Sequence, residues 1–411
     1  MISVEKALRR RGGLLPGLWP VRAVSVLLLI VLQGVAVSGA VPAGPLATAP
    51  QVCIAALFAT IGFSAARPAA GATWRAAMWD RVRIALPPFM LIVVGSAFAL
   101  GPLVTNRGLR SYGTDPDTYA YLLNLLGAPQ YRLPGVFEFN NVADIVNAIV
   151  WTAPFYLLVL AAAALRPSRR WIRWVPGALA VSLILVALTA DATDLLRGGG
   201  RDLTSMALRG DGAPALIGGL LGAAAFHARA WLPADWRVAG GAALLLAGLL
   251  RIAGGDDQIA SLVRVGVAVP SAYLAVFALL RPLPFAAVGR ALAPYLPALL
   301  LFSFPIQQVA VQYGPKVQQA WLNLLLSLPV ALLLAIGWWR LIGRRLARGP
   351  DAVHVPRPTA ARGVRRSLQA IRRTPKETAI GYAAAGLFLL LVFLVLLWML
   401  YVAMQPAPGE A

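Results

Sequence analysis

Few side chains in this sequence could do chemistry, and several of them interrupt long apolar runs. Arg22 begins the apolar run at residues 21–40, and Gln33 follows eleven positions later. A guanidinium can bind a phosphate or a developing negative charge, whereas a carboxamide can hydrogen-bond a hydroxyl but cannot take up its proton at neutral pH. Two simpler roles stay open, because Arg22 could extend to lipid headgroups and Gln33 could bond a neighbouring helix.

A second candidate site is the pair Arg81 and Arg83, which stands just before an apolar run and close to Pro87 and Pro88. Guanidinium groups bind phosphates through forked hydrogen bonds, so this pair could hold a phosphate-bearing donor. Cations at the start of a membrane span also serve as surface anchors. The residues alone leave both readings open.

Amide side chains gather in two further places. One group could bind a sugar by hydrogen bonds and ring stacking, or could cap and anchor the helix that follows. It comprises Asn140, Asn141, Asn147 and Trp151. The other group follows one expected helix, where its amides could line a cavity or bridge helices. It comprises Gln307, Gln308 and Gln312.

Metal and soluble-enzyme chemistry have no motif here. The chain holds one cysteine and two histidines, His227 and His354, which are far apart in the sequence. A structural or catalytic zinc site needs three or four such ligands, so we expect no metal. The sequence also lacks a phosphate-cradling glycine loop and a Ser-His-Asp signature.

Composition identifies the elements that must position these residues as membrane helices. Hydrophobic residues make up 59% of the chain, and soluble domains have roughly 45–50%. A span needs about 20 apolar residues, so we expect an all-α polytopic transmembrane bundle of about ten core spans plus one C-terminal span. The expected spans are residues 21–40, 51–66, 84–103, 145–165, 174–190, 213–227, 238–250, 259–280, 292–312, 321–339 and 379–403.

The net charge of +21 is distributed as a topology signal. With the N-terminus in the cytoplasm, the clustered arginines fall in alternate loops, as the positive-inside rule requires, and the C-terminus is expected in the periplasm. We therefore expect no nucleic-acid partner and assign the basic surfaces to membrane lipids.

Three regions follow from this pattern. Residues 1–343 form the expected transmembrane domain, and its outward segment 106–144 is long and rich in tyrosine, which indicates a folded or re-entrant cap. Residues 344–378 form a basic cytoplasmic linker, with ten basic residues between Arg344 and Lys376. Residues 379–411 add a further membrane helix and tail.

Five segments, in order, resemble the integral-membrane acyltransferase family 3, whose members O-acylate lipopolysaccharide and other surface glycans. Arg22 and Gln33 stand at the positions of the arginine and histidine in the family's first span. The other segments are similar to its Phe-x-x-Ser-Gly-Phe, Arg-Ile-x-Pro, Leu-Pro-Gly-Val-Phe with Asn-x-Ser-Leu-Trp-Thr-Leu-Pro-x-Glu, and Phe-Pro-x-Gln-Gln motifs. They are residues 58–63, 81–87, 133–137 with Asn147 to Pro154, and 304–308.

The resemblance implies transfer of an acetyl-like group from acyl-CoA, as co-substrate rather than bound cofactor, to a hydroxyl of a surface glycan or lipid-linked sugar. The setting it implies is a bacterial inner membrane. Arg22 and Gln33 would be the catalytic positions and Arg81 and Arg83 would bind the donor. Residues that would hold the acceptor or the shape of the site are Asn147, Trp151, Gln307 and Gln308.

Four polar family positions have changed, and this opens an alternative. Gln33 replaces the histidine thought to act as base, Trp19 replaces an aspartate, Ile61 a serine and Tyr156 a glutamate. Loss of a general base alone costs roughly 10²–10⁴ in rate. The competing expectation is an inactive family member that acts as a membrane partner or carrier in polysaccharide assembly or export. A small-molecule transporter ranks last, because paired broken helices are absent from the sequence pattern.

Overall fold

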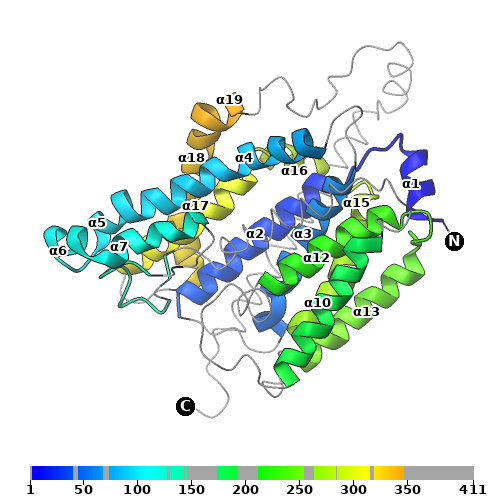
Figure 1. Cartoon of the computed structure of the whole chain (residues 1–411), viewed down its shortest axis with the longest axis horizontal. Coiled ribbons are helices and arrows are strands. Elements are labelled where there is room, and N and C mark those ends of the chain that lie inside the picture. The colour runs from blue at the N-terminus through cyan, green and yellow to red at the C-terminus, as the bar shows by residue number, and fades with distance from the viewer. Residues whose placement is uncertain are drawn as a thin grey trace.

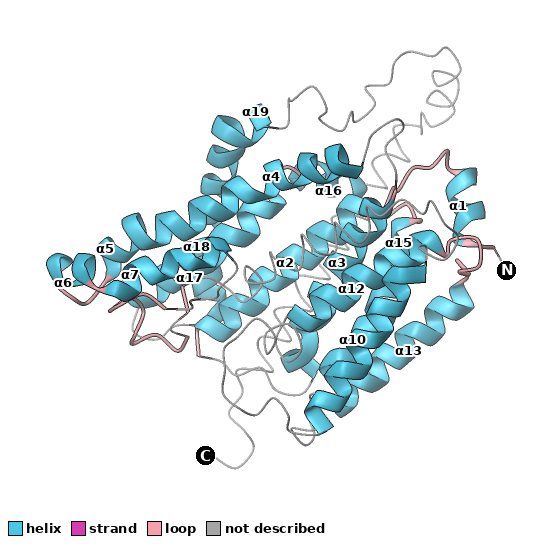
Figure 2. Ribbon diagram, viewed as in Figure 1, coloured by secondary structure: helices cyan, strands magenta, loops and turns pink. Residues whose placement is uncertain are grey.

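The computed structural model describes residues 2–39, 45–67, 74–126, 130, 132–142, 144–145, 174–192, 212–253, 263–283, 285–314 and 319–346. These residues form helices joined by turns, and in these ranges β-structure is limited to an isolated bridge between Ser3 and Pro233. The helices form an elongated bundle with α1 (Val4–Arg10) and α6 (Leu109–Thr114) at opposite ends (Figures 1 and 2).

The long helices are α2 (Leu18–Val37), α3 (Pro45–Ala66), α4 (Trp74–Gly95), α10 (Val175–Ala192), α12 (Gly212–His227), α13 (Trp236–Ile252), α15 (Ala268–Leu279), α17 (Leu296–Tyr313) and α18 (Ala320–Trp338). Short helices are α5 (Gly101–Val104), α7 (Pro116–Ala120), α16 (Ala286–Leu292) and α19 (Arg344–Leu346). A π-helical turn at Ser96–Leu100 joins α4 to α5, and another at Trp339–Gly343 joins α18 to α19.

Within the described residues, four helical segments are long and apolar enough to cross a membrane: Leu18–Val37, Leu46–Ala66, Leu86–Val104 and Ala320–Leu346. A fifth span results if α16 and α17, which meet at a bend of 71°, are taken together. Shorter apolar helices lie at Val175–Ala187, Gly212–His227 and Val263–Leu279. The expected helical membrane fold is confirmed at this level, and the number of about ten spans stays a prediction.

Two expected spans, at residues 145–165 and 379–403, lie outside the described residues, as does the linker beyond residue 346. The third expected span, at residues 84–103, corresponds to the apolar segment Leu86–Val104, and the helix that leads into it, α4, already begins at Trp74. The π-helical turn and α5 continue the apolar part of α4. Pro102 does not interrupt the helix, because it stands in the first turn of α5, where a proline is tolerated.

Glycines bring α3 and α12 into close contact. A Cβ atom at Gly62 of α3 would overlap the Gly219 carbonyl oxygen, and one at Gly222 of α12 would overlap that of Ala59. Gly218 and Gly222 form a G-x-x-x-G pattern on α12, the spacing that lets membrane helices approach through their backbones. This pair of helices is therefore held by van der Waals packing at short range.

Helix α2 lies at the centre of the bundle and contacts α3, α15, α16, α17 and α18. Its residues Leu29 and Ile30 are almost completely buried in the largest hydrophobic cluster. Because α2 touches so many helices, its polar side chains Arg22 and Gln33 face protein. This central position makes α2 the element on which the candidate site is built.

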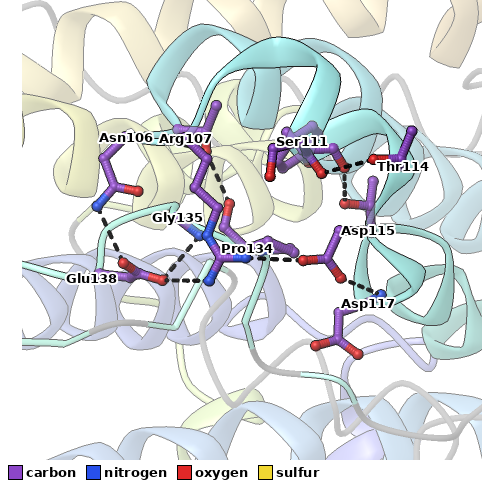
Figure 3. Close-up of polar contacts among 12 residues, drawn as sticks. Asn106, Arg107, Ser111, Thr114, Asp115, Asp117, Pro134, Gly135 and Glu138 are labelled. Atoms are coloured by element: carbon purple, nitrogen blue, oxygen red, sulfur yellow. Dashed lines mark hydrogen bonds and ion pairs between the residues drawn. The ribbon is translucent and has the colours of Figure 1, made fainter.

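The segment after α5 folds as a cap, as the sequence predicted. Glu138 accepts hydrogen bonds from the Gly135 amide at 3.0 Å and from Asn106 Nδ2 at 3.1 Å, and pairs with Arg107 at 3.6 Å (Figure 3). Arg107 also bonds Asp115 at 2.9 Å. Gly135 has φ +70°, a left-handed conformation that favours glycine. These contacts close the Leu133–Phe137 turn onto the end of α5.

Tyr112 fastens the cap to the π-helical turn beneath it. Its buried phenol donates a hydrogen bond of 2.7 Å to the Ala97 carbonyl, and Gly101 leaves no room for a Cβ beside that phenol oxygen. Burial raises the pKa of Tyr112 to about 12, because the ionised phenolate would lose its hydration.

Candidate functional site

Arg22 lies in the first turns of α2, where its guanidinium binds α3. Its Nε donates to Thr60 Oγ1 at 2.9 Å, and its Nη2 donates to Ser64 Oγ at 2.9 Å. The guanidinium also lies 5.3 Å from the ring centroid of Trp19, within the range of a cation–π contact. Arg22 therefore extends across to a neighbouring helix, and the guanidinium is held in one orientation.

The hydroxyls that hold Arg22 flank Ile61, the position where the resembling motif has a serine. Thr60 and Ser64 also donate to backbone carbonyls of α3, Leu57 O at 2.7 Å and Ile61 O at 3.0 Å. Each hydroxyl can donate once and still accept from Arg22. With isoleucine at position 61, the arginine still has hydroxyl partners on two successive turns of α3.

Gln33 lies near the other end of α2 and is 5% exposed, in contact with α17. Ser303 Oγ approaches Gln33 Oε1 at 3.4 Å and the Leu300 carbonyl at 3.1 Å. A hydroxyl has one proton, so these two acceptors compete for it. Gln33 Nε2 has no hydrogen-bond partner among the described residues.

Arg22 and Gln33 occupy the same side of α2 at different heights. Eleven residues correspond to about three helical turns, or roughly 16 Å along the axis. The two side chains therefore point in similar directions without touching the same groups. A substrate that used both would have to extend along α2.

Gln307 and Gln308 of α17 bridge elements. Gln307 Nε2 donates to the Ile30 carbonyl of α2 at 2.9 Å. Gln308 Nε2 donates to the carbonyls of Val142 and Asp144 at 2.6 and 2.8 Å, and Gln308 Oε1 accepts from Asn140 Nδ2 at 3.0 Å. Of the two roles that the sequence left open for these amides, helix bridging is the one observed.

The asparagines Asn140 and Asn141 fasten the end of the cap. Besides the Asn140–Gln308 contact, Asn141 Nδ2 donates to the Val37 carbonyl at the end of α2 at 3.0 Å. Gln312 Nε2 adds a bond to the Val104 carbonyl at 2.9 Å. The predicted amides 140, 141, 308 and 312 thus come together where the cap meets α2 and α17.

Arg81 and Arg83 lie within α4, shortly before its apolar segment, which begins at Leu86. Helix positions two apart do not share a face, so the backbone does not favour a two-arginine clamp on one phosphate. Asn147 and Trp151 lie outside the described residues.

Asn323 and Ser327, on α18, belong to the same polar region and were missed from sequence. Asn323 Nδ2 donates to the Gln307 carbonyl at 3.0 Å, and both residues are almost completely buried. The sequence did carry a signal for this site, because Asn323 and Ser327 are polar residues four positions apart in an apolar run.

Within the part of the chain that the structure describes, no three His, Cys, Asp or Glu side chains gather as a metal site would require. The two ends of α2 instead offer a cation held by hydroxyls and a neutral amide cluster. Comparison with known proteins adds no relative: no family model, curated protein or solved structure matches this chain.

Proposed function

We propose that this protein is a divergent membrane-bound O-acyltransferase of a bacterial inner membrane, which transfers an acetyl-like group from acyl-CoA to a hydroxyl of a surface glycan or lipid-linked sugar. The observation that carries the proposal is the arrangement of α2, with a fixed guanidinium near one end and a buried amide about three turns further along the same side. Five sequence segments in family order support it.

In this proposal Arg22 holds negative charge of the donor on the cytoplasmic side. Its contacts with Thr60 and Ser64 orient the guanidinium, which can bind a donor phosphate or the thioester carbonyl. The acyl arm then extends along α2 towards Gln33. Arg81 and Arg83, earlier in α4, provide further positive charge near the start of its apolar part.

Gln33 would orient the acceptor by hydrogen bonding and would not act as a base. The acceptor oxygen attacks the thioester carbonyl, an ester C–O bond forms, the C–S bond breaks, and the acceptor proton ends on the departing thiol. Because a carboxamide does not titrate, this transfer would be slow compared with one assisted by histidine, by roughly 10²–10⁴. Gln308 and the cap would hold the acceptor side, together with Asn147 and Trp151.

One observation favours a second function, that of a non-catalytic membrane partner in polysaccharide assembly. Arg22 is bonded to α3, and Gln33 is buried against α17, so both family positions also hold helices together. A protein of this kind would need its shape and no turnover.

The test is the ester-linked acyl content of surface glycans, measured by mass spectrometry in a strain without the gene and after complementation. Transferase action predicts a specific ester that is restored by the wild type, raised by Gln33→His and reduced by Gln33→Leu. The partner function predicts unchanged esters with an altered amount of exported glycan. Arg83→Ala tests donor binding: unchanged ester content and acyl-CoA affinity would remove Arg83 from the site.

A further inference from the structure

Four polar atoms between α2, α17 and α18 have no hydrogen-bond partner among the described residues: Gln33 Nε2, Gln307 Oε1, Asn323 Oδ1 and Ser327 Oγ. Their residues are 5, 0, 0 and 1% exposed. Buried polar groups are normally paired, and an orphan in a membrane interior has no lipid group to bond.

The residues that carry these atoms lie on three helices that hydrogen bonds hold together. Gln307 Nε2 bonds the Ile30 carbonyl, one turn before Gln33 on α2, and the Gln307 carbonyl accepts from Asn323 Nδ2 at 3.0 Å. Ser327 lies one turn after Asn323 on α18. Gly34 keeps the helices close, since a Cβ there would lie 3.4 Å from Gln307 Nε2. The existing bonds hold the amides in place and leave one end of each unused.

The unused ends define the chemistry of a ligand. Gln33 offers N–H donors, Gln307 and Asn323 offer carbonyl acceptors, and the Ser327 hydroxyl can do either. A hydroxyl group both accepts and donates, so it complements this set. None of the four side chains carries a charge, and an ion placed among them would lack a counter-charge.

We propose that Gln33, Gln307, Asn323 and Ser327 form a binding site for one neutral hydroxyl, occupied by water in the resting protein. Water in protein interiors typically makes two to four bonds to otherwise unsatisfied groups, which is the number this cluster provides. Asn323 and Ser327 thereby become ligand-binding residues, which extends the polar region to α18. The proposal does not depend on transferase activity.

Water-edited solid-state NMR of the full chain in lipid vesicles tests this proposal. The side-chain NH₂ signal of Gln33 is identified through the Gln33–Gly34 pair, the only Gln–Gly pair in the sequence. The matched control is Gln308, equally buried, whose Nε2 already donates two bonds. We expect magnetisation from water to reach Gln33 Nε2 several-fold faster than Gln308 Nε2. Equal build-up at the two amides would overturn the proposal.

Variants then test whether the residues of the cluster bind the same water molecule. Asn323→Leu removes one acceptor and should slow the build-up at Gln33, whereas Ser271→Ala, which removes an unpartnered buried hydroxyl on α15, should leave it unchanged. An unchanged rate in Asn323→Leu would show that water binds Gln33 alone and would contradict the site. If that variant does not fold, the comparison within the wild type still decides.

A soluble glycoside separates the two sources of the hydroxyl. If methyl glucoside slows the water build-up at Gln33, the site also accepts the hydroxyl of an organic ligand, which supports the site and an acceptor role. If it has no effect while Gln33 remains hydrated, the site is supported as a water site. Loss of glycan esterification is a separate measurement, so the failure of one proposal leaves the other intact.

Discussion

Two helix interfaces in this bundle are held by opposite means. Between α3 and α12, Gly62, Gly218 and Gly222 let the backbones touch. Between α2, α17 and α18, Gln307 and Asn323 reach across with side-chain hydrogen bonds. At the first interface the backbones are in close contact, and at the second several polar side-chain atoms have no partner among the described residues. The α3–α12 interface is thus closely packed, whereas the interface of α2 with α17 and α18 contains the polar region that we propose binds a ligand.

The largest expected effect comes from breaking the glycine interface. Gly222→Leu would place a side chain where the Ala59 carbonyl already lies, and overpacking costs roughly 1–3 kcal/mol or more. We expect a strongly lowered thermal midpoint or loss of folded protein in detergent. The matched control is Gly248→Leu on α13, where a Cβ meets nothing within 4 Å. Equal behaviour of the two variants would contradict the close packing of α3 on α12.

Breaking the amide contacts is expected to cost less and to be graded. Gln308→Leu removes the bonds to the Val142 and Asp144 carbonyls and the side-chain bond from Asn140, which keeps its bond to the Gln308 backbone carbonyl. We expect a loss of about 1–3 kcal/mol, the cost of removing partners from buried polar groups. Gln312→Leu on the same helix loses the bond to the Val104 carbonyl and should be milder. Unfolding of both variants in mixed micelles measures the order, and a reversed order would be inconsistent with the bridging role of Gln308.

A third prediction concerns Arg22, whose contacts lie between the two types of interface. Arg22→Lys removes the guanidinium that donates to Thr60 and Ser64 at the same time. We expect the free energy of unfolding to fall by about 1–2 kcal/mol, since hydrogen bonds to charged groups contribute in that range. In a double-mutant cycle with Thr60→Val the losses should be non-additive. If ester transfer falls in Arg22→Lys and is unchanged in Thr60→Val, Arg22 acts on the donor and not through packing.

The smallest effect at neutral pH is expected in the cap. The folded pKa of Tyr112 is raised from about 10 in the unfolded chain to about 12. Its contribution to stability is therefore fully present below pH 10 and is lost as the pH rises towards 12. Proteolysis of the cap between pH 9 and 12 should show this loss, and Tyr112→Phe should abolish the pH dependence from this group. A wild-type cap that is equally stable throughout would contradict the burial of this phenol.

The sequence by itself determined the helical segments and the folded cap. The apolar run at residues 21–40 is long enough to cross a membrane as a helix, in which the backbone polar groups bond one another; this is a local property. The run forms α2, with a difference of a few residues at each end. The arginine and glutamine inside it were singled out for the same local reason, since a polar group in such a run needs a partner.

Which partner each polar group has was decided by the tertiary structure. Gln33 meets Ser303, 270 residues away in sequence, and Asn140 meets Gln308, 168 residues away. The G-x-x-x-G pattern on α12 could be read from sequence, but not that α3 would lie against it. Spacing along one helix specifies a face, whereas neighbours depend on how all helices pack together. For that reason Asn323, which the sequence shows only as a polar residue in an apolar run, becomes part of the polar cluster in the folded bundle.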